Sequence, residues 1–362
     1  MKIESRVKNY DVEMADAILQ NKQMLLDGFS CSNEFYFIDE NVYKIYQKEI
    51  DVFTQGAKIL VIEAHETNKE YIKLAEYYSW LIEHQFTRKD VLITIGGGIL
   101  QDISGFIAST LYRGMKWIFL PTTLLAQADS CIGSKTSINF KDSKNLIGSF
   151  YPPDRIFIDS AFCKTLTPEY FNSGVGEVIK FHLLSNQEGY KKLKTYIFAK
   201  DGHESQLLKD IIWSTLNIKR SYFEEDEFDT DRRNLLNYGH CFGHALESAS
   251  HFEVCHGEGV LVGMSFADLL SLKRGAMSQS LYGEFQKIYE GHYPDFDLST
   301  IAAEEIVKYL KKDKKRVGKD LTMVIGEDIG KFHKCDNITE DEVHKVYQEF
   351  LVKWQTYRKL DS

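Results

Sequence analysis

The sequence predicts an α/β domain with a parallel sheet over residues 1–165, followed by a mainly α-helical domain over residues 166–362. In the first half, short apolar runs alternate with longer amphipathic stretches, which is typical of a parallel sheet covered by helices. A triple glycine, residues 96–98, directly follows one of the apolar runs. From about Pro168 the pattern becomes mainly helical.

In the first domain, short apolar runs predict four strands, over residues 35–38, 58–62, 91–95 and 117–120. Helices are expected in the amphipathic stretches that follow the first three strands, over residues 40–48, 68–86 and 99–111. Because strands and helices alternate, the strands should run parallel to one another.

In the second domain, helices are expected over six segments, residues 168–196, 204–224, 231–250, 256–275, 301–313 and 339–357. Residues 321–325 are the one segment that reads as extended. The sequence therefore predicts a change of architecture near residue 165.

Composition limits the classes of function. The hydrophobic fraction of 43% and the charged fraction of 27% are ordinary for a globular protein, and 362 residues suffice for two domains. The formal charge is −9 and basic tracts are short, so no nucleic-acid partner is expected. An acidic protein that binds an anionic substrate must gather positive charge locally.

The sequence also indicates a cytoplasmic location. No run of 18 apolar residues occurs, so no membrane partner is expected. The first residues lack the apolar core of a signal peptide. The six cysteines are scattered without a C-x-x-C pair, which is typical of reduced thiols in the cytosol.

The triple glycine suits a bound phosphate. Gly97 and Gly98 would let backbone N–H groups approach the anion, and the helix that follows would offer its N-terminal dipole. Asp102, four residues later, could accept a hydrogen bond from a nucleotide. A tight strand-to-helix turn also needs glycine, so bare turn chemistry remains the alternative. Asp39 and Asn41 suit ribose hydroxyls, with helix capping as their alternative.

Four polar residues share a regular spacing. Arg233, Asn237, His240 and His244 are separated by 4, 3 and 4 residues, so on a helix they would form one stripe. Such a stripe would be costly to bury unless it lined a site. The alternative for the arginine is a structural pairing with Asp226, Asp229 or Asp231.

Metal-ligating residue types occur in two further segments. His256 opens a predicted helix, and Glu177 is followed one turn later by Lys180. One glutamate with two histidines would leave an open coordination position, as in catalytic rather than structural zinc sites.

Three motifs together resemble the 3-dehydroquinate synthase family, within the wider sugar-phosphate cyclases. The first is the segment 96–106, followed by Arg113 and Gly114. The second runs over 121–130 and continues through Lys135 to Asn145. The third covers 237–244 and continues to 256–258. Together these motifs are far more specific than a single glycine turn.

The resemblance implies site residues at the matching positions of this chain. Zinc, with cobalt as the alternative, would be held by Glu177, His240 and His256. NAD would be bound by Asp39, Asn41, Glu66, Lys69, Gly97, Gly98, Asp102, Thr122, Thr123, Lys144, Asn145 and Thr165. The substrate would be bound by Arg113, Asp129, Lys135, Asn145, Lys180, Lys219, Arg233, Asn237, His244 and Lys314, with Lys315 as the alternative to Lys314.

The resemblance also implies the chemistry. The substrate is a phosphorylated sugar acid, 3-deoxy-D-arabino-heptulosonate 7-phosphate, which is closed to 3-dehydroquinate with loss of phosphate. Transient oxidation by NAD, phosphate elimination, reduction and an aldol closure would follow one another. Among the residues implied to be catalytic, His244 would transfer a proton near the zinc. The others are Lys180, Lys219, Asp129, Arg233 and Asn237. A homodimer is expected, in which Arg113 can serve the neighbouring subunit's site.

Three alternatives remain open. A cyclase with a different substrate is one, because Gln101 and Ser134 replace glycines common in the family and Asp229 replaces a glutamate. A dehydrogenase of the glycerol or iron-dependent alcohol type is another, although its cleft would carry fewer cations. A non-catalytic relative is the third, although it would be expected to lose a metal ligand or a phosphate lysine.

Overall fold

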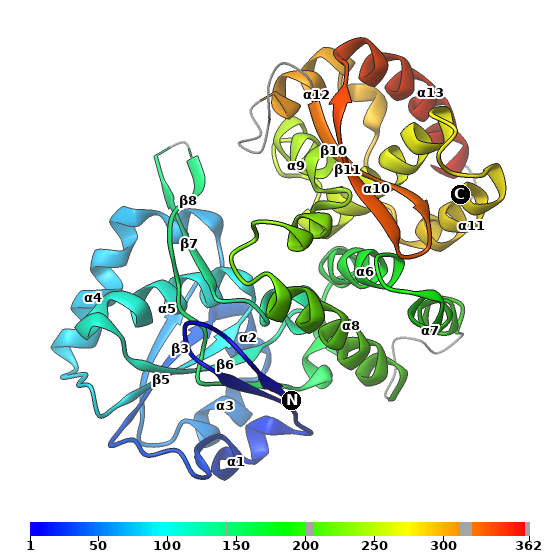
Figure 1. The fold of residues 1–362 in the computed structure, drawn as a ribbon. Coiled ribbons are helices and arrows are strands. Elements are labelled where there is room, and N and C mark those ends of the chain that lie inside the picture. The colour runs from blue at the N-terminus through cyan, green and yellow to red at the C-terminus, as the bar shows by residue number, and fades with distance from the viewer. Residues whose placement is uncertain (142, 200–205, 312–320, 359–362) are drawn as a thin grey trace. The chain divides into compact units, whose positions relative to one another are not determined.

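The computed structural model describes residues 1–141, 143–199, 206–311 and 321–358 (Figure 1). Contacts between residues divide the chain into two compact units, Met1–Leu166 and Thr167–Ser362. Among the described helices, none is both long and apolar enough to cross a membrane.

The first unit contains a seven-stranded sheet. The four strands expected from the sequence are confirmed as β3 (Glu34–Asp39), β4 (Lys58–Ile62), β5 (Val91–Gly96) and β6 (Lys116–Pro121), and they pair in parallel. Three further strands extend the sheet beyond β6 in the order β9, β2, β1. These are β9 (Arg155–Ile158), β2 (Tyr10–Met14) and β1 (Lys2–Ile3), of which only β1 is antiparallel to its neighbour.

Both faces of this sheet are covered, as the alternation of β3 shows. Tyr36 points to one face and meets Phe53 of α3 (Gln47–Phe53) at a ring distance of 6.0 Å. Phe37, the next residue, points to the other face and meets Trp80 of α4 (Leu74–Glu83), also at 6.0 Å. Because successive side chains of a strand alternate between faces, a strand buried on both sides reads as a continuous apolar run.

Two of the three helices expected in this unit are shorter than the sequence predicted. The expected helix 40–48 divides at Tyr46 into α2 (Glu40–Ile45) and α3. The expected helix 68–86 is confirmed only as α4, which follows two short 3₁₀ turns, η2 (Glu66–Lys69) and η3 (Tyr71–Lys73). Helix α5 (Gly98–Thr110) matches its expected range within a residue.

A β-hairpin that the sequence analysis did not predict packs on α5. It consists of β7 (Lys135–Phe140) and β8 (Ser143–Phe150), which pair antiparallel. A Cβ built on Gly105 of α5 would lie 2.7 Å from Thr136 Cγ2. Glycine is therefore needed where the helix meets this hairpin.

The second unit is mainly helical, as expected. The expected helix 168–196 is interrupted, because Asn186 caps a new helix by accepting a hydrogen bond from the N–H of Gly189 at 3.0 Å. The α-helices of the second unit are α6 (Pro168–Leu183), α7 (Gln187–Ile197), α8 (Gln206–Glu225), α9 (His240–Ala249), α10 (His256–Lys273), α11 (Gln279–Tyr289), α12 (Ala303–Leu310) and α13 (Glu340–Arg358). Between α12 and α13 lie two strands, β10 (Leu321–Asp328) and β11 (Lys331–Ile338). Helix α11 and strand β11 were not predicted.

Helix α10 is the centre of this unit. Its residues from Gly257 to Ser271 are all buried, and its apolar residues do not follow one face. A helix that is apolar all round is buried on all sides. Helices α6 and α9 therefore both find a packing surface on α10.

Residues 231–250 do not form the single helix that was expected. A 3₁₀ helix, η7 (Arg232–Asn237), is followed by Gly239 with a φ of 79°, and α9 begins at the next residue. A Cβ on Gly239 would also lie 2.4 Å from the carbonyl oxygen of Val260 on α10. Only glycine fits a left-handed turn pressed this closely against a neighbouring helix.

The prediction of one continuous polar stripe was therefore wrong. Two of its members precede the Gly239 turn and two follow it on α9: first Arg233 and Asn237, then His240 and His244. The local pattern predicted a helix because an i, i+4 spacing takes no account of a turn imposed by tertiary packing.

Candidate active site

Three helices of the second unit meet through backbone contacts at glycines. A Cβ on Gly176 of α6 would lie 2.2 Å from the carbonyl oxygen of Gly257, at the start of α10. A Cβ on Gly257 would in turn lie 1.7 Å from the carbonyl oxygen of Ser173, whose hydroxyl accepts a hydrogen bond from the Gly257 N–H at 2.9 Å. This close approach brings Glu177 of α6 beside His256 of α10.

Glu177 faces two imidazole rings. Its Oε1 lies 3.5 Å from Nε2 of His240 and 3.5 Å from Nε2 of His256. Both carboxylate oxygens are buried. The ammonium group of Lys180 contacts the other oxygen, Oε2.

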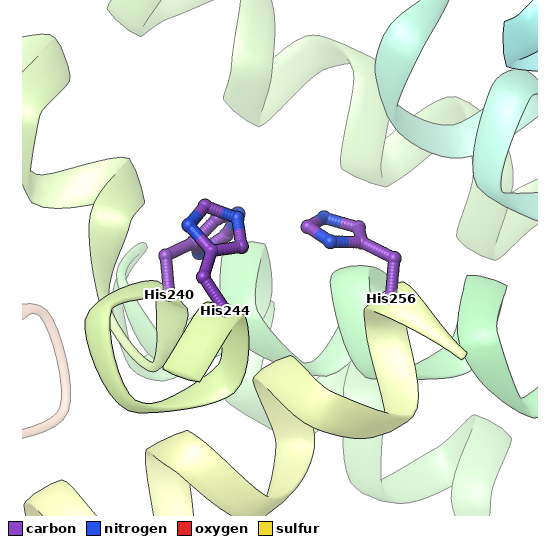
Figure 2. A group of neighbouring side chains, drawn as sticks. All are labelled: His240, His244 and His256. Atoms are coloured by element: carbon purple, nitrogen blue, oxygen red, sulfur yellow. The ribbon is translucent and has the colours of Figure 1, made fainter. Parts of the chain in front are cut away.

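His244 belongs to the same cluster. Figure 2 shows the rings of His240 and His244 projecting side by side from α9 toward that of His256, which comes from α10. One nitrogen from each of the three rings lies within 4.8 Å of the others. The structure thus brings together all three residues expected to bind the metal and, beside them, the residue expected to transfer a proton.

The far side of each proposed imidazole ligand is fixed by a hydrogen-bond acceptor. Nδ1 of His240 lies 3.2 Å from the carbonyl oxygen of Tyr238, and Nδ1 of His256 lies 2.9 Å from Oε1 of Glu247. Since these oxygens only accept, each Nδ1 carries a proton, and the neutral form of each ring presents the lone pair of Nε2. Partners of this kind orient histidine ligands in metal sites.

Burial and the charges of neighbouring residues both shift the pKa values of this cluster. Burial disfavours ionisation of Glu177, but Lys180 and His256 outweigh burial and lower the pKa of Glu177 to about 2. Burial, followed by the charge of Lys180, holds the pKa of His240 well below its usual range. Burial also disfavours the charged form of His256, yet Glu247 and Glu177 outweigh it and hold that pKa above its usual range.

This donor set fits a divalent metal. The buried carboxylate of Glu177 is paired with Lys180 at Oε2 and directs Oε1 toward two imidazole nitrogens, so Oε1 and both Nε2 atoms are available to one divalent cation. Two imidazoles and one carboxylate form the three-ligand set of catalytic zinc sites, which leave one position open. The residues that would hold the ion are Glu177, His240 and His256.

Two lysines expected at the substrate share one aromatic ring. Nζ of Lys180 lies 4.6 Å from the centre of the Phe181 ring, and Nζ of Lys219 on α8 lies 5.9 Å from it. Both lysine side chains are buried. Lys180 is also paired with Glu177, so the two lysines place buried positive charge beside the carboxylate of the histidine cluster.

Arg233 is buried against residues that shortly precede it in the chain. Its guanidinium donates a hydrogen bond to the carbonyl oxygen of Glu227 and lies 5.4 Å from the ring centre of Phe223. Asp226 accepts a hydrogen bond from the backbone N–H of Arg233 at 3.1 Å. Among the described residues, no carboxylate lies within ion-pair distance of the guanidinium. Asn237, at the end of η7, donates to the carbonyl oxygen of Asn234.

In the first unit, the turn after β5 lies beside the turn after β6. The backbone N–H of Thr122 donates to the carbonyl oxygen of Gly96 at 3.0 Å, and a Cβ on Gly97 would lie 3.0 Å from Cγ2 of Thr123. Helix α5 begins at Gly98. The glycines, both threonines and a helix N-terminus thus come together at the carboxyl edge of the sheet, where α/β folds bind nucleotides.

Asp39 lies next to this turn and caps a helix. A Cβ on Gly96 would lie 3.3 Å from its Cβ, because β3 and β5 are neighbours in the sheet. Its carboxylate accepts a hydrogen bond from the N–H of Asn41 at 2.8 Å, which caps α2. The capping alternative considered for Asp39 therefore has direct structural support.

A second group of expected cofactor residues is joined by hydrogen bonds. Nζ of Lys69 lies 2.7 Å from Oδ2 of Asp102 and 2.7 Å from Oδ1 of Asn145. Ser137 on β7 binds Asp102 through its N–H and its hydroxyl, both at 2.9 Å. Glu66 accepts a hydrogen bond from the side chain of Asn139 at 2.8 Å.

The remaining expected residues are placed in the first unit, with one exception. Arg113 is exposed and has a φ of 63°, Asp129 lies in η5 (Ala126–Ser130), and the hydroxyl of Thr165 lies 3.1 Å from that of Tyr46. Lys135 and Lys144 are exposed on β7 and β8. The prediction for Lys314, with Lys315 as its alternative, lies outside the described residues.

Several site residues were missed by the sequence analysis. Glu247 could have been found, because it follows His244 by three residues on the same helix face. Ser137 and Asn139 carry no such signal, since the hairpin that presents them was not predicted. Tyr238 contributes a backbone carbonyl group, which no side-chain pattern reveals.

Two family models match the chain in succession. The model described as 3-dehydroquinate synthase N-terminal matches residues 59–173, and the model described as 3-dehydroquinate synthase C-terminal matches residues 174–316. Together they cover well over half of the chain.

Curated relatives match over most of their length. A protein from Dictyoglomus thermophilum named 3-dehydroquinate synthase is 33% identical over 96% of this chain and 97% of its own. A protein of the same name from Clostridium acetobutylicum is 37% identical over 81% of this chain and 83% of its own.

Solved structures share the fold at lower identity. A 2-deoxy-scyllo-inosose synthase complexed with carbaglucose-6-phosphate, NAD+ and Co2+ has a TM-score of 0.86 at 21% identity, covering 96% of this chain and 99% of its own. The 2-epi-5-epi-valiolone synthase ValA from Streptomyces hygroscopicus, with NAD+ and Zn2+ bound, has a TM-score of 0.85 at 22% identity, covering 98% and 99%.

Proposed function

Because the chain belongs to the 3-dehydroquinate synthase family, we propose that it converts 3-deoxy-D-arabino-heptulosonate 7-phosphate to 3-dehydroquinate and phosphate. It is then a carbon–oxygen lyase that closes a carbocycle. Its cofactors are NAD and a divalent metal, for which zinc is our specific proposal. NAD is assigned to the unit Met1–Leu166 and the metal to the unit Thr167–Ser362.

The observation that carries the proposal is the position of the buried Glu177 carboxylate, which faces two imidazole rings and Lys180. Its buried Oε1 lies 3.5 Å from the Nε2 atoms of both His240 and His256, while Lys180 contacts Oε2. Because Nδ1 of each ring donates to Tyr238 or Glu247, Nε2 is the nitrogen with which each neutral ring would bind a metal. This arrangement supports a metal site with an open position rather than a closed structural one.

The cofactors supply what side chains cannot. When bound, NAD would accept and return one hydride, and the metal would act as a Lewis acid on the substrate oxygen that is oxidised. For zinc the support is the donor set of two imidazoles and one carboxylate.

The protein's own residues then bind the substrate and move protons. Lys180 and Lys219 offset the negative charge of the phosphorylated acid, since their ammonium groups gather at the Phe181 ring. Arg233 is assigned to the carboxylate, because a guanidinium can donate two parallel hydrogen bonds to it. Asn237 and Asp129 are proposed to position substrate hydroxyls. His244 is proposed to transfer the proton, because it lies in the histidine cluster.

The nucleotide site is proposed on two groups of side chains. The glycine turn and Thr122 and Thr123 would hold the phosphates. The hydrogen-bonded group of Lys69, Asp102 and Asn145 would hold the nicotinamide end. The other members of the proposed site are Asp39, Asn41, Glu66, Lys144 and Thr165, and Arg113 and Lys135 are proposed to bind the substrate phosphate.

A homodimer and a cytoplasmic location complete the proposal. The six cysteines are all free, which supports a reducing compartment. Light scattering during gel filtration would give the mass of the assembly, and a mass of one chain of 41.8 kDa would contradict the dimer.

The substrate assignment is tested with three sugar phosphates. Purified protein with NAD and Zn2+ is given the heptulosonate phosphate, glucose 6-phosphate or sedoheptulose 7-phosphate, and released phosphate and carbocyclic product are measured. We expect turnover only with the carboxylated substrate. Preference for either neutral sugar phosphate would leave a cyclase with a different substrate.

A further inference from the structure

A buried carboxyl group behind the histidine cluster has no part in the proposed reaction. Asp268 lies in the middle of α10 and is completely buried. Its two oxygens accept hydrogen bonds from two phenols, Tyr238 at 2.5 Å and Tyr289 at 2.8 Å. The two hydroxyl groups lie 3.2 Å from each other. A buried carboxyl group with two donors fixes the position of both rings.

Tyr238 contacts the proposed metal ligand His240 directly, whereas Tyr289 reaches it only through Tyr238 and Asp268. The carbonyl oxygen of Tyr238 accepts the hydrogen bond from Nδ1 of His240. Gly239, between them, is the left-handed residue at which α9 begins. Tyr289 belongs to α11, where it contacts Asp268, Tyr238 and the aromatic rings of Phe285 and Tyr293.

We propose that Tyr238, held by Asp268, is a positioning residue for the metal ligand His240. The phenol anchors the side chain to α10, and the backbone carbonyl of the same residue orients the imidazole. This inference rests on the proposed metal site. It adds the tyrosine and the buried carboxyl group, which act on the metal site through His240.

Only Gly239 separates Tyr238 from His240 in the chain, so the position of the tyrosine bears directly on that of the histidine. Without the hydroxyl, the Tyr238 ring would still pack against Phe332, whose ring centre lies 4.7 Å away. The carbonyl that fixes Nδ1 of His240 would then lose its side-chain anchor on α10 and keep only the backbone contact of Gly239. Loss of a partner that orients a histidine ligand typically weakens metal binding.

The chain offers a matched control for this test. Tyr238→Phe and Tyr289→Phe each remove one phenol hydroxyl from the same carboxyl group, and both rings are completely buried. Their costs in stability should therefore be similar. Only Tyr238→Phe removes the anchor next to His240, so a difference in metal affinity isolates the positioning role.

The measurement is the dissociation constant for Zn2+, by competition with a chelating dye, together with thermal unfolding of each variant. We expect Tyr238→Phe to weaken Zn2+ binding about tenfold, at the lower end of the range for such partners, with Tyr289→Phe within about twofold of the wild type. Equal Zn2+ affinity in Tyr238→Phe and the wild type, or equal weakening in both variants, would overturn the inference.

The wild type and His256→Ala are measured in the same series. If Zn2+ binding does not depend on His256, the proposed metal site itself fails. If it depends on His256 but is unchanged in Tyr238→Phe, only the positioning role fails.

A variant that leaves a buried carboxylate oxygen unpaired could fail to fold. The comparison is then made in the Asp268→Asn background, where the amide needs only one phenol as donor. The same tenfold difference between the Tyr238→Phe and Tyr289→Phe double variants is expected, and its absence would again overturn the inference.

Discussion

At the scale of single residues, His240 and His256 direct their Nε2 atoms at one carboxylate oxygen. This convergence could be predicted only in part. The sequence indicated which residue types would form the site, but their meeting depends on glycine contacts between helices that are far apart in the chain. Asp39 illustrates the opposite case, because its capping role was visible in the local sequence.

The first prediction concerns His256. Replacing it by alanine removes one of three proposed ligands, so the metal content of the purified protein should fall far below that of the wild type. Chelation should abolish wild-type activity, and added Zn2+ should restore it. The control is His333→Ala, because that side chain is 47% exposed and pairs with Glu327. A fully active, metal-free His256→Ala protein would show that the assignment of this ligand is wrong.

The second prediction concerns Arg233. Arg233→Ala should lower turnover of the heptulosonate phosphate by at least about a hundredfold, because breaking a desolvated charge pair costs about 2–5 kcal/mol. Metal and NAD content should not change. The neighbouring Arg232, 42% exposed and paired with Glu225, provides the control variant Arg232→Ala. Nearly wild-type turnover by Arg233→Ala would remove the argument for a carboxylated substrate.

At the scale of elements, α10 aligns the site, because α6 and α9 both approach its backbone at glycines. Helices and central strands could be predicted, since their apolar patterns are long and regular. The breaks at Asn186 and Gly239 could not, because the first depends on one capping side chain and the second on contact with α10. The strands β1, β2, β9 and β11 were missed because they are short or lack a distinct pattern.

The third prediction compares two helical glycines. A Cβ at Gly257 would lie 1.7 Å from the Ser173 carbonyl oxygen, whereas a Cβ at Gly283 on α11 has no atom within 4 Å. Gly257→Ala should therefore lower the free energy of unfolding by about 1–3 kcal/mol, as overpacking does. Gly283→Ala should raise it by about 0.5–1 kcal/mol through helix propensity. Urea denaturation measures both, and equal stabilities would contradict the proposed packing.

The fourth prediction concerns pH. Burial raises the pKa of Asp268 to about 7, against the opposing hydrogen bonds of Tyr238 and Tyr289. Between the lower pKa of the unfolded chain and about pH 7, the folded protein therefore holds a proton that the unfolded chain has lost. The free energy of unfolding should fall as pH rises through this window.

The Asp268→Asn variant has no titrating carboxyl group at this position. Its free energy of unfolding should therefore lack the part of the decrease with pH that Asp268 causes. The measured quantity is the difference between the free energies of unfolding of the wild type and the variant, from urea denaturation at several pH values. This difference should decline from acidic to neutral pH. A constant difference would mean that Asp268 ionises in the folded protein as it does in the unfolded chain.

At the scale of the whole molecule, the two family models meet at residues 173 and 174, inside α6 and close to the division between the two units. In the proposed function, the nucleotide binds at the sheet of the first unit and the metal at the glycine-packed helices of the second. A dehydrogenase could use both cofactors as well. The cyclase differs because the hydride returns to the same molecule, which leaves the cofactor unchanged after each turnover.

The central claim is that NAD is regenerated in each turnover, and measuring the products together with NADH tests it most directly. Purified protein with Zn2+ receives an excess of 3-deoxy-D-arabino-heptulosonate 7-phosphate and NAD far below the substrate concentration. Phosphate, 3-dehydroquinate and NADH absorbance are then followed together. We predict equal amounts of phosphate and 3-dehydroquinate, well beyond the NAD supplied, with no steady rise in NADH. NADH that accumulates in proportion to the substrate consumed, without release of phosphate, would contradict the account.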